Sequence, residues 1–284
     1  MAVFKYINNN GSVVDSDQPI FTAQNRAFRY GDALFETIRL MDGEILYLDK
    51  HLLRLKSGMK VLGMSFHSDF TFNNMHLMMQ HLDQVNSMKG NGRFRLEVYR
   101  QDGGYYTPSN NEVAYVLEAE SVNNKRYLLN DIGLRIEIYM EHQKPTTPLS
   151  NIKSSNALCY VLAGMFRRNS GFDDCLVLNT NNNICEAISS NIFLVKEKVL
   201  FTPALSEGCV AGVMRQVVID QVKSSGKQVE ETKITISDLL SADEIFITDV
   251  INGIRWVGAF RNKRYFNLYS RDLLSKINET RMVK

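Results

Sequence analysis

The chain has 284 residues, 44% of them hydrophobic and 23% charged, and its 33 Lys and Arg residues nearly balance 31 Asp and Glu residues. This composition argues against disorder, and at roughly 100–200 residues per domain the length predicts one large or two medium domains. A net charge of +2 without any Lys/Arg-rich run argues against nucleic-acid binding, and no apolar stretch approaches the roughly 20 residues that span a bilayer. We therefore expect neither nucleic acid nor a membrane as a partner.

The N-terminus and the cysteines predict a cytoplasmic protein. The first residues lack a basic region followed by an apolar block of about 7–15 residues, which a secretory signal requires. The four cysteines are widely spaced and form no C-x-x-C pair, so we expect reduced core residues. The five histidines have no metal-ligand spacing, and no metal site is expected.

The first half of the chain predicts a small α+β domain. Short β-type runs at residues 3–7, 12–14, 34–40 and 44–48 are separated by Asn10-Gly11 and Asp42-Gly43, which are hairpin signals. Apolar residues then recur with helical spacing over 49–62 and about 68–88, and residues 93–99 and 113–117 read as two further strands. A polar, aperiodic segment follows. We place the domain boundary there, giving domains 1–120 and 121–284.

The second half predicts a larger domain with a mixed sheet or small barrel and flanking helices. Strands are expected at 133–141, 175–178, 192–195, 200–202 and 244–248, and a helix at 213–223. Another helix should follow Lys153, with Ser154 or Ser155 as its cap and Gly171 as its stop. Its expected buried stripe consists of Leu158, Val161, Leu162, Met165 and Phe166.

Four features carry possible chemistry, and each also has an ordinary structural interpretation. Lys153 lies at a loop-to-helix junction, where a desolvated amine can form a Schiff base, although most lysines are simply solvated. Glu186 begins a polar run before a buried strand, which suits either a polar ligand or a turn. Gly212 precedes a helix whose free N–H groups can bind an anion, although helices often begin after glycine. Arg54 is either an ordinary solvated arginine or a residue that binds a phosphate group.

Taken together and in order, these segments resemble one family. The motifs are Tyr30-Gly-Asp-Ala-Leu-Phe-Glu-Thr-Ile-Arg39, His51-Leu-Leu-Arg54, Ile152-Lys153-Ser-Ser-Asn156, Glu186-x-x-Ser-Ser190-Asn191 and Gly212-Val-Met-Arg215. They resemble those of the class IV, fold-type IV pyridoxal-phosphate enzymes, and the likeness spans about residues 5–257. The resemblance implies the two-domain fold of D-amino-acid aminotransferases, a homodimer, a small-molecule substrate and pyridoxal 5'-phosphate as cofactor.

The resemblance also implies a role for each motif residue. Lys153 would be the Schiff-base lysine, carried by the C-terminal domain, and Glu186 would pair with the pyridine nitrogen. The phosphate would be bound by Arg54 and by the backbone amides of Val213 and Met214 after Gly212. Ser190 and Asn191 would hold the phosphate or orient the ring.

Within the family, the motif details resemble 4-amino-4-deoxychorismate lyase, which releases pyruvate. The shared features are Lys-x-x-Asn, Phe35-x-Thr37-x-Arg39, Gly-x-Met-Arg-Gln and an Arg100-x-x-Gly-Gly-x-x-x-x-Pro108 loop. Thr37 would be the proton donor of the lyase, and Tyr30, Arg100, Tyr105 and Tyr106 are candidate substrate residues. Tyr105 stands where those lyases often have arginine. An amino-acid aminotransferase of the branched-chain or D-amino-acid type is the alternative, and a catalytically inactive relative is a remote one.

Overall fold

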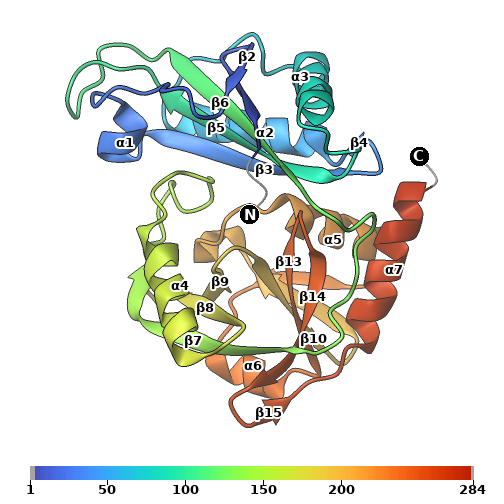
Figure 1. Cartoon of the computed structure of the whole chain (residues 1–284). Helices are drawn as coiled ribbons and strands as arrows, with labels where there is room; N and C mark the ends of the chain where they lie inside the picture. Colours follow the sequence, from blue (N-terminus) through green and yellow to red (C-terminus); the bar gives the residue numbers. More distant parts are fainter. Residues whose placement is uncertain (1–3, 283–284) are drawn as a thin grey trace. The chain divides into compact units, whose positions relative to one another are not determined.

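The structure, a computed structural model, describes residues 4–282, which fold as two compact units (Figure 1). The first unit runs to Lys125 and also contains residues 152–156, whereas the second consists of residues 126–151 and those from Ala157 onward. The two-domain α+β organisation is confirmed. The first unit extends to residue 125 rather than 120, and the strand predicted at 113–117 extends to Ser121. Val3, which begins the first predicted strand, lies outside the described residues.

The first unit is built on an antiparallel six-stranded sheet with the order β2-β1-β6-β5-β3-β4. Its strands are β1 (Tyr6–Asn9), β2 (Ser12–Asp15), β3 (Ala33–Met41), β4 (Glu44–Ile45), β5 (Gly92–Arg100) and β6 (Val113–Ser121). Both predicted hairpins are present, and their turn residues have positive φ, with Asn10 at 48° and Gly11 at 87°. This conformation matches the twist of the two strands that each turn joins.

Helices cover one face of this sheet. They are α2 (Leu48–Val61) and α3 (Phe72–Val85), and a short α1 (Arg26–Tyr30), which the sequence did not predict, precedes β3. Alternate β3 residues such as Leu34 and Ile38 pack with Leu52 and Leu55 of α2 in one core. Helix α3 begins later than predicted because Thr71 accepts a hydrogen bond from the Asn74 amide.

The second unit is built on a mixed nine-stranded sheet with the order β12-β11-β10-β13-β14-β7-β8-β9, to which β15 adds beside β14. Its strands are β7 (Leu134–Lys144), β8 (Asp174–Asn179), β9 (Ile184–Ala187), β10 (Asn191–Lys196), β11 (Val199–Pro203), β12 (Val229–Thr232), β13 (Glu244–Asp249), β14 (Gly253–Phe260) and β15 (Lys263–Arg264). The pairs β11/β12, β7/β14 and β7/β8 are parallel. Because β9 also approaches β10, the sheet curls toward the predicted barrel.

Four α-helices flank this sheet: α4 (Leu158–Ser170), α5 (Val213–Ser224), α6 (Ile236–Ser241) and α7 (Leu268–Met282). A 3-10 turn, Leu205–Glu207, precedes α5. Helix α4 packs on β7 and β8, while α5 and α7 pack together on β13 (Figure 1). Among residues 4–282, no helix has the length and apolar character needed to cross a bilayer.

Helix α4 differs from its prediction in its start and in its buried face. Its N-cap is Ala157 rather than Ser154 or Ser155, because those serines lie along β3 instead. The predicted stripe is largely exposed, at 78% for Leu158, 54% for Val161, 44% for Leu162 and 48% for Met165. Ala163 is buried instead, with Cys159, Tyr160 and Phe166 packed around it. The helix has two apolar faces, and spacing alone does not show which one is buried.

Candidate functional site

Lys153 lies in a short segment that adds to the edge of β3. The Phe35 amide donates to the Lys153 carbonyl (2.9 Å), and the Ser155 amide donates to the Ala33 carbonyl (3.0 Å). The Lys153 ammonium lies 4.0 Å from the centre of the Phe35 ring. These pairings assign residues 152–156 to the first unit, whereas the sequence placed Lys153 in the C-terminal domain. Lys153 is half-buried at a sheet edge, and the helix starts five residues later.

The opposite face of β3 carries a buried charged cluster that holds Arg54. Glu36 is 2% exposed, and its carboxylate accepts from Arg54 Nε (2.8 Å), Arg54 Nη2 (2.5 Å) and His51 Nδ1 (2.6 Å). Since the α2 residues His51 and Arg54 are three apart, they lie on one side of that helix and meet the same carboxylate. The sequence pointed to Arg54 but not to Glu36 or His51 as its partners.

Protonation in this cluster follows from burial and from the Arg54 charge. Burial acts to raise the pKa of Glu36, but the Arg54 charge and the hydrogen bonds from Arg54 and His51 outweigh it and lower that pKa to about 2. Burial lowers the pKa of His51, and the positive charges of Arg54 and Lys153 add to this effect. Together they outweigh the hydrogen bond and the charge of Glu36, which raise that pKa. His51 is therefore a neutral donor through Nδ1, and its buried Nε2 has no hydrogen-bond partner among the described residues.

Thr37 and Phe35 share the face of β3 on which Lys153 contacts the ring. Strand alternation places residues 35, 37 and 39 together, as predicted. Thr37 is half-buried and pairs with Arg95 of β5. The Arg95 guanidinium lies 4.0 Å from the Phe35 ring centre, so two cations contact this ring. Arg95 was not among the predicted site residues, although its alternation with Arg93 and Glu97 along one strand marks a charged face.

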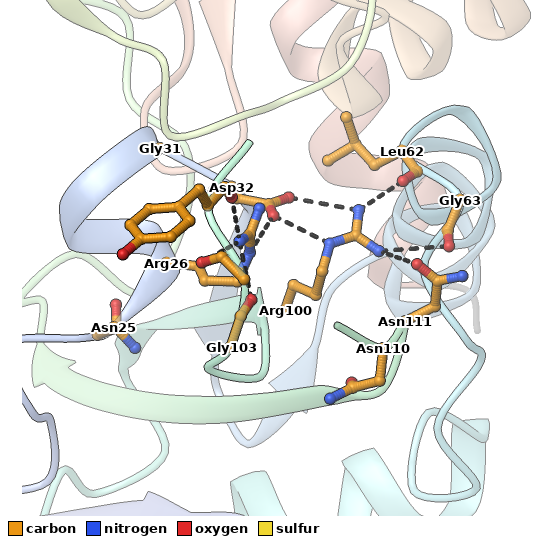
Figure 2. Close-up of polar contacts among 12 residues, drawn as sticks. Asn25, Arg26, Gly31, Asp32, Leu62, Gly63, Arg100, Gly103, Asn110 and Asn111 are labelled. Atoms are coloured by element: carbon orange, nitrogen blue, oxygen red, sulfur yellow. Dashed lines mark hydrogen bonds and ion pairs between the residues drawn. The ribbon is translucent and has the colours of Figure 1, made fainter. Parts of the chain in front are cut away.

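Arg100, a predicted substrate residue, is instead part of a buried network centred on Asp32 (Figure 2). Arg100 is 5% exposed and donates to Asp32 Oδ2 (2.9 Å), Asn111 Oδ1 (2.6 Å) and the carbonyls of Leu62 (2.6 Å) and Gly63 (3.4 Å). Its guanidinium group thus joins the start of β3 to the end of α2. This geometry gives Arg100 a structural role and does not favour a substrate contact.

The second arginine on Asp32 anchors the loop that carries the candidate tyrosines. Arg26 Nε donates to Asp32 Oδ2 (2.9 Å), and Arg26 Nη1 donates to the Gly103 carbonyl (3.1 Å) (Figure 2). Arg26 Nη1 also donates to the Tyr105 carbonyl (2.6 Å). The Tyr105 and Tyr106 side chains are 80% and 90% exposed. The half-buried Tyr30 contacts Tyr106, with ring centres 5.6 Å apart. The three tyrosines are thus close in the first unit, but Tyr105 and Tyr106 are not enclosed there.

In the second unit, Glu186 is a buried carboxylate with three donors. It is 3% exposed and accepts from Lys144 Nζ (2.5 Å), Tyr160 Oη (2.7 Å) and the Val210 amide (2.9 Å). Burial first, and then the Glu186 charge, raise the pKa of Tyr160, which keeps its hydroxyl protonated as a donor. Neither Lys144 nor Tyr160 was predicted, although Tyr160 follows Lys153 by seven residues on the helix expected there.

Ser190 and Asn191 contact protein groups. The Ser190 hydroxyl lies between Asp249 Oδ2 (3.3 Å) and Arg255 Nη2 (3.2 Å). Asn191 Nδ2 donates to the Val210 carbonyl (2.9 Å), on the segment that leads into α5. Asn191 therefore positions the start of that helix, and its proposed role in holding a phosphate is indirect in this geometry.

The N-terminus of α5 fits a phosphate group. No side chain caps it, and the first amides of any helix, here those after Gly212, have no acceptor within the helix. A Cβ on Gly212 would lie 1.8 Å from Asn191 Oδ1, so only glycine fits there. Val213 and Met214 bury their side chains, which leaves their backbone as the available part. The residues present thus suit the anionic end of a phosphorylated cofactor.

Comparison with known proteins gives one consistent family. A family model described as "Amino-transferase class IV" matches residues 33–260. The chain is 28% identical to an aminodeoxychorismate lyase of Vibrio harveyi, over 81% of this chain and 83% of that protein. It is 30% identical to a putative branched-chain-amino-acid aminotransferase of Methanocaldococcus jannaschii, over 84% and 82%. A branched-chain amino acid aminotransferase from Thermobaculum terrenum, solved in its PLP-form, aligns with a TM-score of 0.84 and 20% identity, covering 97% of this chain and 93% of that one.

Proposed function

The chain belongs to the class IV aminotransferase family, and on that premise we propose that it is a pyridoxal-phosphate enzyme in which Lys153 forms the Schiff base with the cofactor. The contact between the Lys153 ammonium and the Phe35 ring, 4.0 Å from its centre, is the observation that carries this proposal. It places the amine on the face of β3 that also bears Thr37. When bound, the cofactor supplies an electron sink for the carbanion that forms at the substrate Cα.

The residues of each unit then have separate tasks. In the first unit, Arg54 neutralises phosphate charge, and Glu36 fixes the orientation of its guanidinium group. In the second unit, the Val213 and Met214 amides bind phosphate oxygens at the N-terminus of α5. Glu186 would accept a hydrogen bond from the ring nitrogen of the cofactor, and the Lys153 amine would be the base for the proton on the substrate Cα.

We propose 4-amino-4-deoxychorismate lyase as the reaction, with release of pyruvate and 4-aminobenzoate. This proposal is supported by the shared face of Phe35 and Thr37 and by the 28% identity to the Vibrio harveyi lyase. Thr37 would donate a proton near the leaving pyruvate. Arg95 also lies beside Phe35, but it already pairs with Glu97 Oε2 at 2.6 Å, so we assign it no substrate carboxylate.

Amino-group transfer from an amino acid to a 2-oxo acid is the second candidate. The 30% identity to the Methanocaldococcus jannaschii protein favours it, and the buried Arg100 removes one cation that a substrate with several carboxylates would use. An inactive relative is disfavoured because Lys153, Glu186 and Arg54 are all present. Supplying aminodeoxychorismate, and separately a panel of L- and D-amino acids with 2-oxoglutarate or pyruvate, separates the candidates. Pyruvate release supports the lyase, and amino-group exchange without it supports the transferase.

We also propose that the protein is a homodimer. Leu158, Val161, Leu162 and Met165 form an exposed apolar face on α4, here called the α4 face. Four large apolar side chains on neighbouring turns of one helix make a continuous surface of the kind that mediates association.

A further inference from the structure

Glu186 is held by donors from three separate segments of the second unit. Lys144 ends β7, Tyr160 is in the first turn of α4, and Val210 precedes α5. Lys144 Nζ is 2.5 Å from Glu186 Oε1 and also donates to the Ser150 carbonyl (2.9 Å). The ammonium group is therefore fixed at two points, and the position of the carboxylate is fixed with it.

Burial makes the Lys144 charge important to Glu186. The two residues are 8% and 3% exposed, so little water reaches either charge. A carboxylate buried this deeply requires a counter-charge, since neutral donors alone leave most of its desolvation uncompensated. The other two donors, the Tyr160 hydroxyl and the Val210 amide, are neutral. Lys144 is the cation that this carboxylate contacts.

The hydrogen bonds also distinguish the two oxygens of Glu186. Oε1 accepts from both Lys144 and Tyr160, which uses both of its acceptor positions. Oε2 accepts from the Val210 amide at 2.9 Å, which uses one acceptor position. Oε2 therefore has one acceptor position left for a further donor, such as a ring nitrogen, with the carboxylate already oriented.

We propose that Lys144 is a positioning residue for the cofactor, acting through Glu186. It keeps this carboxylate oriented, with Oε2 available for the ring nitrogen. The inference rests on the proposed function, in which Glu186 pairs with that nitrogen. Without the Lys144 ammonium, Oε1 loses one of its two donors and the buried carboxylate loses the cation that it contacts, so its orientation toward the ring nitrogen is no longer fixed.

A double-mutant cycle on cofactor affinity tests this role. The wild type, Lys144→Met, Glu186→Gln and the double variant are titrated with pyridoxal phosphate, and binding is followed by absorbance. Lys144→Met alone should weaken binding by about 10-fold or more, which is typical when the partner of a ligand-binding side chain is removed. In the Glu186→Gln background the same substitution should change affinity by less than about threefold, because the group through which Lys144 acts is gone.

Two further measurements distinguish positioning from simple packing. Lys144→Arg, which retains the positive charge, should recover most of the lost affinity. Lys276→Met removes a lysine that pairs with Asp272 at 2.8 Å on exposed α7, and it should leave affinity unchanged. The inference would be overturned if Lys144→Met bound pyridoxal phosphate as tightly as the wild type or more tightly. It would also be overturned if Lys144→Met lowered affinity equally in the wild-type and Glu186→Gln backgrounds, or if Lys144→Arg did not recover affinity. A wild type that binds no pyridoxal phosphate would instead overturn the proposed function, while the same cycle measured by unfolding of the cofactor-free protein would still report the Lys144–Glu186 coupling.

Discussion

The Arg54 guanidinium group donates two hydrogen bonds to the Glu36 carboxylate, from Nε to Oε1 at 2.8 Å and from Nη2 to Oε2 at 2.5 Å. This two-point contact fixes the plane of the guanidinium group as well as its position. The orientation of Arg54 is therefore set by β3 and does not require a bound ligand. The same carboxylate also binds His51, so one buried anion organises two α2 side chains.

Because of this cluster, we predict that the free energy of unfolding decreases in two stages as the pH is lowered. The folded-state pKa of His51 is lowered, so the unfolded chain binds a proton first, and the free energy of unfolding should decrease as pH falls below about 6.5. The pKa of Glu36 is lowered to about 2, so its contribution should be lost as pH falls from about 4.5 toward that value. Urea unfolding at a series of pH values measures both stages.

Glu36→Gln should remove the stage that begins near pH 4.5. It should also reduce the free energy of unfolding at pH 7 by about 3 kcal/mol, because the buried Arg54 guanidinium then has no carboxylate to pair with. Glu230→Gln, at an exposed position, serves as the control and should keep both stages. An unchanged acid profile in Glu36→Gln would contradict the role of this carboxylate.

The hydrogen bonds that Arg26 and Arg100 make to Asp32 predict that this carboxylate keeps the loop at residues 101–111 ordered. Asp32→Asn keeps the side-chain shape but removes the charge that two buried arginines share, which should destabilise the protein by about 3 kcal/mol. Because Arg26 holds the Gly103 and Tyr105 carbonyls, amide hydrogen exchange should rise across residues 101–111. Asp17→Asn, on the exposed β2 side of the first unit, should leave exchange in this loop unchanged. Normal protection of the loop in Asp32→Asn would refute the anchoring role.

Local patterns predicted much of the fold, because hairpin turns, strand alternation and helical spacing are short-range signals. The Asn10-Gly11 and Asp42-Gly43 turns and the helix that starts near Asp49 are where the sequence placed them. The sequence did not predict α1, β9, β12, β14, β15, α6 or α7. The elements α1, β9, β12 and β15 have five or fewer residues and carry too little periodicity, but β14 and the fifteen-residue α7 are long enough to have been predicted. The buried face of α4 was predicted incorrectly because both of its faces are apolar.

The candidate site was predicted residue by residue, but the partners of those residues were not. Arg54, Lys153 and Glu186 are recognisable from motifs, whereas Glu36, Lys144 and Tyr160 reach them through tertiary contacts. Lys144 is 42 residues from Glu186 in the chain, and no local pattern joins the two. The motif predicts a substrate role for Arg100 because it does not reveal that Asp32 and Asn111 bind this side chain.

The lyase proposal predicts a specific effect of Thr37→Val. This change keeps the side-chain shape but removes the hydroxyl, and it should slow pyruvate release by about 100-fold, the scale of a lost general acid. The absorbance of bound cofactor should be unchanged, because Thr37 is not proposed to contact it. Thr180→Val, at an exposed turn, should release pyruvate at the normal rate. A normal rate for Thr37→Val would remove the hydroxyl from the mechanism.

The homodimer proposal predicts that one charge on the α4 face disrupts association. Val161 is 54% exposed, so Val161→Glu should fold normally yet elute as a monomer, because a carboxylate buried at an apolar interface has no counter-charge. Light scattering after size-exclusion chromatography measures the mass. Ser224→Glu, at the exposed end of α5, should remain dimeric. A dimeric Val161→Glu would place the interface elsewhere, and a monomeric wild type would refute the proposal.

Reductive labelling tests the central claim most directly. The protein is saturated with pyridoxal phosphate, treated with borohydride and digested, and the modified peptide is identified by mass spectrometry. We predict a visible absorbance band before reduction and a single phosphopyridoxyl group on Lys153, with none on Lys144. Labelling of Lys144 or of another lysine, or the absence of any band at saturating cofactor, would contradict the assignment of Lys153.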